Sequence, residues 1–265
     1  MNYVGMTGLS AMTGMSGGGI GGDPDAAAWI ADIQAAGGTV SSADRSAIET
    51  CVVDLKAIDY WDDIYSMGLL WWGLEAANAV RAKIGGNITF PAGTRTHNID
   101  YLKFSGNGYA NLGFNRTNSG MTLSSNGAML AIPGTAIEGF GTDYGAGSNT
   151  EEILFFVCQW GADYYYTGGN WSTTAGIQSP SPTTDPCLIA GNRLNNNMQI
   201  ARANSGGAAN LVSRADAAGG TTGTINNFLV GACNDPGGTA NAFTNRPYMF
   251  LSLIHISEPT RPIIR

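Results

Sequence analysis

The chain has 265 residues, of which 43% are hydrophobic and only 12% are charged. Its net charge of −7 argues against electrostatic binding to nucleic acid or to an anionic membrane, because both need a cationic surface. No run reaches the roughly 20 apolar residues of a membrane-spanning helix, so we expect no membrane insertion.

Residues 1–22 have the composition of a flexible or loosely docked arm. They hold eight glycines, four methionines and no charged side chain, and glycine at this density raises the entropy cost of ordering. A secretion signal would need a basic start and a continuous apolar run. The first basic residue is Arg45, and glycines interrupt the apolar stretch, so we expect no secretion by this segment.

Residues 23–84 predict a small α-helical module. Asp23 before Pro24 is a good N-cap with proline at the first helical position. Helix-forming residues continue to Ala36, and Gly37-Gly38 supplies a stop. A second helix begins near residues 41–42. Its apolar residues, at helical spacing, are Ile48, Cys51, Val52, Leu55 and Ile58.

Two further segments of this module carry tryptophans. Residues 57–65 favour a short helix or turn that presents Trp61 and Ile64. Residues 69–84 favour another helix, which would contain Trp71 and Trp72.

Residues 85–250 predict a β-sandwich domain. They contain 26 of the 38 glycines, and short β-prone runs alternate with turn clusters. The runs are Tyr101–Phe104, Met121–Leu130, Ile153–Trp160, Leu188–Ala190, Met198–Ala201, Ala209–Ser213, Phe228–Ala232 and Tyr248–Phe250. No amphipathic helix separates them, which disfavours a parallel α/β fold. The expected fold is mainly β, an antiparallel jelly-roll sandwich that follows the helical module.

Residues 251–265 differ in composition from the rest, with no glycine and no asparagine. Leu251–Arg261 resembles the conceptual translation of a sequencing adapter, so we expect a non-native tail. In that case neither His255 nor Glu258 bears on function, and the sandwich is truncated at its C-terminal end. The other interpretation is a genuine closing strand followed by a proline-punctuated tail.

Candidate catalytic residues are few, and we predict that the chain is not an enzyme. A Ser-His-Asp triad needs a histidine base. Outside the suspected tail the chain has only His97, in a polar turn where we expect solvent exposure. Glycosidases need two facing carboxylates. Glu151 and Glu152 are adjacent and would lie on opposite faces of a strand, while Glu138 and Asp143 are too loosely placed.

The sequence predicts no resident cofactor, and calcium is the alternative that stays open. The four cysteines form no Cys-x-x-Cys pair, so small buried thiols are the default, although pairing of Cys187 with Cys158 or with Cys233 is open. Calcium needs only several oxygen ligands at short range. The acidic residues expected in loops are Asp143, Asp163, Asp185 and Asp235.

An aromatic cluster supplies the candidate binding residues. Its members are Trp160, Tyr164, Tyr165, Tyr166 and Trp171. Flat aromatic side chains with polar edges suit the apolar faces of sugar rings. Three consecutive tyrosines cannot all lie on one strand face. The alternative is cross-strand packing of these aromatics within the sandwich.

Several short motifs along residues 23–250 occur together in one known family. Asp23-Pro-Asp-Ala-Ala-Ala-Trp-Ile and Trp61-Asp-Asp-Ile-Tyr resemble a helical module of tail-fibre-type structural proteins in tailed bacteriophage virions, where it usually precedes a concanavalin A-like or laminin-G-like jelly roll. Phe104-Ser-Gly-Asn-Gly-Tyr-Ala-Asn-Leu-Gly-Phe resembles the opening element of that sandwich. Phe228-Leu-Val-Gly-Ala-Cys-Asn and Asn245-Arg-Pro-Tyr-Met-Phe resemble its late strands.

This resemblance implies a virion structural protein of tail-fibre or decoration type, located in the particle and made in the host cytoplasm. Its non-catalytic lectin-like domain would contact carbohydrate on the host surface. Other virion proteins are the implied partners, and a homo-oligomer is compatible with the pattern. The helical part would attach to the virion or pack on the sandwich through Trp61, Trp71 and Trp72. The alternatives are a purely architectural virion protein, a glucanase-type glycoside hydrolase and a secreted lectin.

Overall fold

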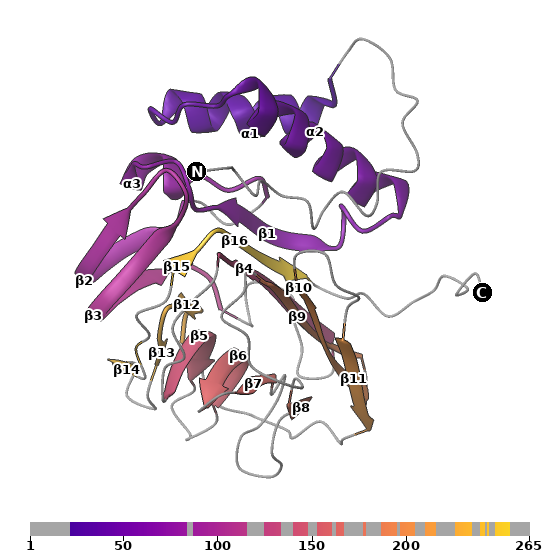
Figure 1. Ribbon diagram of the computed structural model, residues 1–265, viewed down its shortest axis with the longest axis vertical. Coiled ribbons are helices and arrows are strands. Elements are labelled where there is room, and N and C mark those ends of the chain that lie inside the picture. Colours follow the sequence, from indigo (N-terminus) through magenta and orange to yellow (C-terminus); the bar gives the residue numbers. More distant parts are fainter. Residues whose placement is uncertain are drawn as a thin grey trace.

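The molecule is an antiparallel β-sandwich with a helical hairpin on one side (Figure 1). The computed structural model describes residues 22–83, 87–115, 125–133, 140–147, 153–160, 163–166, 177–178, 187–194, 197–204, 210–215, 226–234, 239–241, 243 and 247–254. Residues 1–21 of the predicted arm lie outside this part. Among the described helices, none is both long and apolar enough to cross a membrane.

The first two helices confirm the predicted cap at Asp23 and the predicted helix start near residues 41–42. Helix α1 covers Pro24–Ala35, and the Asp23 side chain accepts hydrogen bonds from the backbone N–H groups of Asp25 and Ala26. Helix α2 covers Ser42–Ala57, and Ser41 with Asp44 forms a reciprocal capping box at its start. Between the helices Gly37 has a φ of +88°, a conformation that glycine adopts without steric cost.

The segment after α2 differs from the prediction. Residues 61–63 form a turn as expected, but Ile64–Leu69 is strand β1. The helix expected over residues 69–84 is wrong, because within the described residues 69–83 only Glu75–Asn78, helix α3, is α-helical. The physical reason is tertiary. Strand β1 pairs with β16 and is covered on both faces, so its apolar side chains lack the alternation that marks a half-buried strand.

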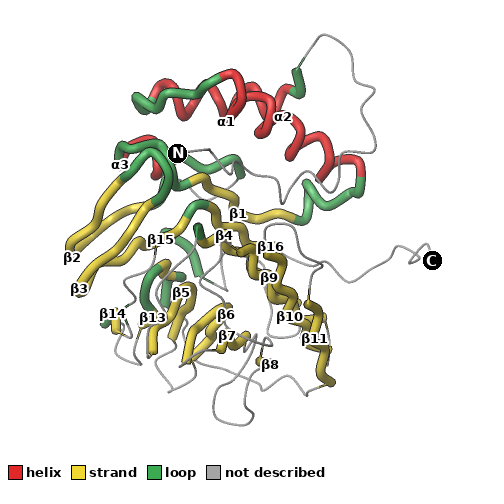
Figure 2. Tube along the Cα trace, in the orientation of Figure 1, coloured by secondary structure: helices red, strands yellow, loops and turns green. Residues whose placement is uncertain are grey.

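Two sheets form the sandwich, and every described strand pairing is antiparallel, so the predicted fold class is confirmed (Figure 2). The six-stranded sheet has the order β1-β16-β4-β9-β10-β11. Its other strands are β16 (Phe250–Ile254), β4 (Ser125–Ile132), β9 (Cys187–Leu194), β10 (Asn197–Asn204) and β11 (Asn210–Ala215).

The eight-stranded sheet has the order β15-β3-β12-β5-β6-β7-β8, and β2 pairs with β3. Its strands are β2 (Thr89–His97), β3 (Leu102–Asn111), β5 (Phe140–Gly147), β6 (Ile153–Trp160), β7 (Asp163–Tyr166), β8 (Ile177–Gln178), β12 (Leu229–Val230) and β15 (Pro247–Tyr248). Strands β13 (Cys233–Asn234) and β14 (Ala240–Asn241) form a separate pair.

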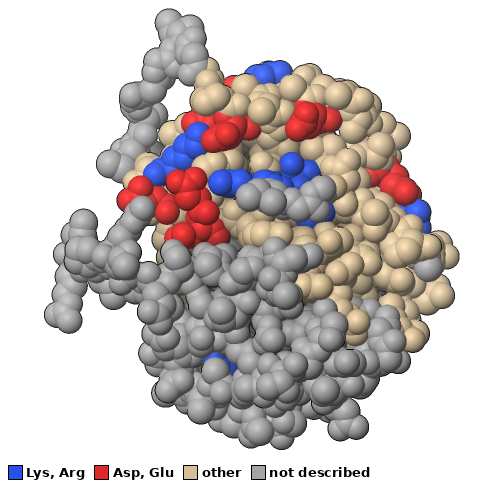
Figure 3. Space-filling view, turned by 180° about the vertical axis from the view of Figure 1, so that it is seen from behind, with Lys and Arg blue, Asp and Glu red and all other residues tan. Residues whose placement is uncertain are grey.

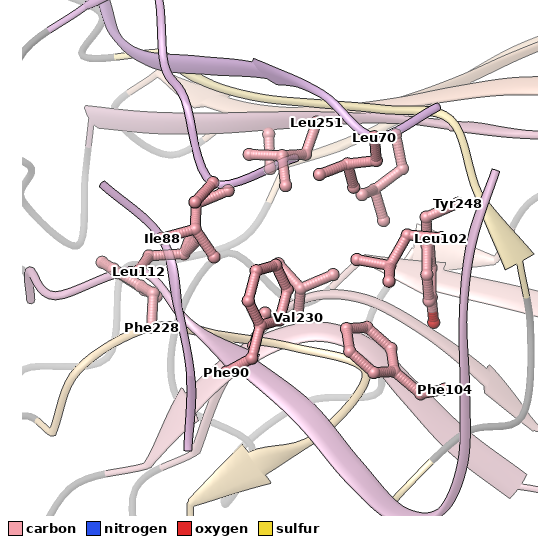
Figure 4. Packing of buried hydrophobic residues seen from close by; sticks show 14 of the residues in the cluster. Leu70, Ile88, Phe90, Leu102, Phe104, Leu112, Phe228, Val230, Tyr248 and Leu251 are labelled. Atoms are coloured by element: carbon pink, nitrogen blue, oxygen red, sulfur yellow. The ribbon is translucent and has the colours of Figure 1, made fainter. Parts of the chain in front are cut away.

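Side chains from both sheets fill the space between them, and we call this group the inter-sheet cluster (Figure 4). It includes Leu102, Phe104, Leu130, Val230 and Leu251, each almost fully buried. Packing is tight enough to dictate residue type. Gly231 has a φ of +82° and lies against the Phe104 ring, so a Cβ there would come within 2.5 Å of a ring carbon.

A second group, the helix–sheet cluster, joins the helical hairpin to the outer face of β1 and β16. Helix α1 contributes Trp29, Ile30 and Ile33, α2 contributes Ile48 and Val52, and β1 contributes Met67. Trp61 and Trp72 belong to this cluster, and Trp71 packs against it. The alternative that the tryptophans hold the helical part on the sandwich is therefore confirmed.

Strand β16 consists of Phe250 and the first four residues of the suspected tail. It lies between β1 and β4 and pairs with both, with Leu251 opposite Gly68 on one side and Leu130 on the other. Leu251 contributes to the inter-sheet cluster. The fold thus uses these residues as a closing strand, whatever their origin, and the rest of the tail lies outside the described residues. The domain boundaries near residues 84 and 250 stay predictions.

Candidate functional site

Four of the five aromatic residues predicted for binding lie on one β-hairpin of the eight-stranded sheet. Trp160 ends β6 and pairs with Asp163, and the three tyrosines continue along β7. Only Gly161 and Ala162 lie between the two strands, a two-residue connection in which glycine is common. The structure describes the backbone positions of these residues, and Trp171 lies outside the described part.

The hairpin lies near the β8 end of the eight-stranded sheet, away from β15 and β3 (Figure 1). Strand β7 pairs with β6 on one side and with the two-residue strand β8 on the other. The register splits the tyrosines as expected, because Tyr164 and Tyr166 occupy one face of the strand and Tyr165 the other. The structure therefore brings Trp160 and the three tyrosines together.

Asp163 is a residue whose place beside the aromatics the sequence interpretation missed. It was considered only as a calcium ligand in a loop, but it begins β7 directly opposite Trp160. The signal was available, because Gly161-Ala162 between two β-prone runs indicates a short hairpin, and such a hairpin pairs its flanking residues.

Other acidic candidates do not form a described site. Asp143 lies within β5 and not in a loop, so that expectation and the one for Asp163 are both wrong. The remaining candidates, Asp185, Asp235, Glu138, Glu151 and Glu152, lie outside the described residues. In the part of the chain that the structure describes, no three metal-ligating side chains gather into a group. Calcium binding stays a proposal.

The structure describes the thiol of one cysteine, Cys51. Cys51 on α2 is a free, partly buried thiol, and burial raises its pKa to about 11. A thiol with a raised pKa is a poor nucleophile and packs as a small apolar side chain. The choice between buried thiols and a disulfide at Cys158, Cys187 and Cys233 falls on side chains outside the described ones, so it stays open.

A polar cluster surrounds His97, and here the expectation of solvent exposure is wrong. His97 ends β2, and its side chain is only 12% exposed. Its Nδ1 lies 2.8 Å from Nδ2 of Asn78, while Oδ1 of Asn78 accepts a hydrogen bond from the backbone N–H of Trp72. Because Nδ2 can only donate, Nδ1 of His97 accepts and its proton lies on Nε2.

The surroundings of His97 favour its neutral form. Burial lowers the pKa of His97, and the nearby charge of Glu75 opposes this shift without cancelling it. Glu75 Oε2 lies 3.5 Å from Nε2, but it accepts its hydrogen bonds from Nε and Nη2 of Arg95. This largely buried imidazole is held by Asn78 and packs edge-on against Phe90, which is a structural arrangement.

A second charged group stabilises the helical hairpin. Lys56 forms ion pairs with Asp23 at 2.8 Å and with Asp25 at 2.6 Å, and the indole N–H of Trp61 donates to Asp25. The ammonium of Lys56 lowers the pKa of Asp23, which in turn raises the pKa of Lys56. Acidic and basic side chains lie side by side over the helical end of the face shown in Figure 3.

Comparison with known proteins concerns the fold. No protein-family model and no curated protein sequence matches the chain. A sialidase from Trypanosoma rangeli, solved with 2-keto-3-deoxy-D-glycero-D-galacto-2,3-difluoro-nononic acid, is similar with a TM-score of 0.50 and 11% identity. The match covers 74% of this chain but only 31% of the sialidase. At that identity the likeness shows a shared β fold and nothing of activity.

Two other solved structures are similar to this chain with lower TM-scores. A legume lectin-like domain from Entamoeba histolytica has a TM-score of 0.34 and 12% identity, over 64% of this chain and 91% of that domain. Tailspike protein 2 of the Escherichia coli O157:H7 bacteriophage CAB120 has a TM-score of 0.39 and 10% identity, over 64% of this chain and 25% of the tailspike. At these TM-scores the two similarities add nothing to the fold assignment, which rests on the sheets themselves.

Proposed function

We propose that this chain is a phage virion structural protein, of tail-fibre or decoration type, whose sandwich binds host-surface glycans without cleaving them. The observation that carries the glycan-binding part is the β6–β7 hairpin. It places Trp160, Asp163 and three tyrosines together on one short hairpin of a rigid sheet. Aromatic faces stack on sugar rings, and a carboxylate accepts hydrogen bonds from sugar hydroxyls.

The virion part of the proposal rests on the sequence resemblance over residues 23–250. The fold is compatible with that role, because a rigid sandwich can present a binding surface while the helical hairpin stays packed on its other side. The partners would be other virion proteins, and copies of this chain would assemble in the particle. Mass spectrometry of purified phage particles that encode this protein tests this part, and its absence from the particles would refute it.

A glycan array probed with the purified full-length chain tests the binding part. We expect binding to a limited set of glycans, loss of that binding in Trp160→Ala, and normal binding in Tyr60→Ala. Tyr60 is the matched control, because it is a half-exposed aromatic in the turn after α2, near the helical hairpin. An array without any bound glycan would refute glycan binding and leave the purely architectural alternative.

The same glycans, incubated with the chain and analysed by mass spectrometry, test the non-catalytic part. We expect each bound glycan to be recovered intact after prolonged incubation. Release of a shorter product would replace this proposal with the glycoside hydrolase alternative.

A further inference from the structure

Register through the eight-stranded sheet assigns each position of the aromatic hairpin to one face. The starting point is Val230 of β12, which pairs with Ala110 of β3. Both belong to the inter-sheet cluster, so their positions lie on the inner face, toward the six-stranded sheet. Residues directly opposite on neighbouring antiparallel strands share a face. Val230 also pairs with Tyr144 of β5, which places that position on the inner face.

The next step crosses from β5 to β6. Tyr144 pairs with Val157, so Val157 also occupies an inner position. The register shifts between these strands leave Asp143 and Phe156 as extra residues, and neither interrupts residues 157–160. Positions alternate from Val157 onward. Trp160 therefore lies at an outer position, on the side of the sheet that faces away from the six-stranded sheet.

The last step crosses from β6 to β7. Trp160 pairs with Asp163 and Cys158 pairs with Tyr165, so Asp163 and Tyr165 share the outer face with Trp160. Tyr164 pairs with Gln159 and lies on the inner face, where Tyr166 follows two positions later. The outer face thus carries two aromatic positions with a carboxylate position between them on β7. The inner face carries two tyrosine positions opposite the second sheet.

We infer that the glycan site of this chain lies on the outer face of the β6–β7 hairpin, at Trp160, Asp163 and Tyr165, and that its ligand is an uncharged glycan. This inference rests on the proposed glycan binding. Trp160 and Tyr165 are diagonal neighbours, about 7–8 Å apart, so both can contact one small ligand. Tyr164 and Tyr166 occupy positions on the other face, toward the six-stranded sheet.

The negative charge of Asp163 favours uncharged glycans over acidic ones. Asp163 adjoins both aromatic positions, and a carboxylate accepts hydrogen bonds from hydroxyl groups but repels another carboxylate. The chain as a whole carries a net charge of −7, which adds to the repulsion of acidic sugars. Neutral sugars offer hydroxyl donors and apolar ring faces, so they match both features of the site.

Neighbouring tyrosines provide the test, because Tyr165 and Tyr166 differ in face but not in chemistry. Affinity for the best neutral glycan and thermal unfolding would be measured for full-length Tyr165→Ala and Tyr166→Ala. We expect Tyr165→Ala to lose about tenfold or more in affinity at an unchanged melting temperature. Tyr166→Ala should melt earlier and keep the affinity of the folded protein within about twofold. Tyr166→Phe replaces it if that variant fails to fold.

Each outcome of the test is decisive. Lost affinity in the Tyr166 variant together with wild-type affinity in Tyr165→Ala would overturn the face assignment while the proposed function stands. Preferential binding of acidic glycans by the unaltered chain would overturn the ligand class, and Asp163→Asn should instead be the variant that gains acidic glycans. A chain that binds no glycan at all would refute the proposed binding and this inference with it.

Discussion

The two apolar clusters of the molecule differ in the elements that build them and in the polar atoms that line them. The inter-sheet cluster consists of aliphatic and aromatic side chains from strands of both sheets and from the segments that flank these strands. The helix–sheet cluster is lined by three buried polar atoms without a hydrogen-bond partner, namely the indole nitrogens of Trp29 and Trp72 and the hydroxyl oxygen of Ser252. Such atoms lose their hydration without compensation, which weakens the attachment of the helical hairpin. Nε2 of His97, beside Phe90 of the inter-sheet cluster, also lacks a hydrogen-bond partner, so the same cost arises where the two clusters meet.

The largest expected effect is the loss of stability when one buried side chain in each cluster is truncated to alanine. Phe104→Ala should lower the free energy of unfolding by about 3–5 kcal/mol, and Ile30→Ala in α1 by about 2–5 kcal/mol. Strands β1 and β16 contribute side chains to both clusters, so both variants should still unfold in one transition, measured by circular dichroism in denaturant. Two separate transitions in Ile30→Ala would show that the helical hairpin unfolds independently.

The ion pairs at the open end of the helical hairpin give the next effect. Lys56→Met keeps the alkyl stem but leaves Asp23 and Asp25 without their counter-charge, and it should destabilise the protein by about 1 kcal/mol near neutral pH. Lys103→Met, at an exposed position on β3, is the control and should have no measurable effect.

Acid should abolish the difference between Lys56→Met and the unaltered chain. The pKa of Asp23 is lowered in the folded state, so its ionisation stabilises the fold above the ordinary value of 3.8. That contribution is lost as the pH falls through the lowered folded pKa. The two unfolding free energies should therefore converge below pH 3.8, and a difference that is constant with pH would contradict this account.

A gain in stability should come from the helix–sheet cluster. Ser252 lies opposite Met67, so its hydroxyl faces the apolar residues beneath the helices, where it has no hydrogen-bond partner. Ser252→Ala removes that oxygen with little change in volume and should stabilise the protein by about 1 kcal/mol. Ser213→Ala, at an exposed position of β11, should leave the melting temperature unchanged. A destabilised Ser252→Ala would mean that the hydroxyl has a partner.

The sequence predicted correctly those elements whose structure is decided by neighbouring residues along the chain. The cap at Asp23, the helix start near residues 41–42 and the strand at Ile153–Trp160 were predicted correctly, because cap chemistry and a continuous β-prone run act locally. Strand β5 was missed, because its glycines weaken the strand pattern and its place comes from pairing with β6 and β12. The same holds for the faces of the aromatic hairpin, which only the register through four strands assigns.

His97 shows a further limit, and it also links the two clusters. Its ring packs against Phe90 of the inter-sheet cluster, while Asn78 connects it to the backbone of Trp72 in the helix–sheet cluster. Residues 19 positions apart meet here, which no local pattern announces. Protonation of Nδ1 would break the hydrogen bond from Asn78, because two donors would then face each other.

The smallest expected effect is therefore a pH dependence that His97 imposes on both clusters together. The folded pKa lies below the ordinary value of 6.5, so the unfolded chain binds more protons and stability declines as the pH falls from 6.5 through the folded pKa. His97→Gln should flatten the unfolding free energy measured between pH 5 and 8. Glu75→Gln removes the charge that raises this pKa, so it should steepen the decline. An unchanged slope in His97→Gln would place the titrating group elsewhere, and the link between the clusters would then carry no pH dependence.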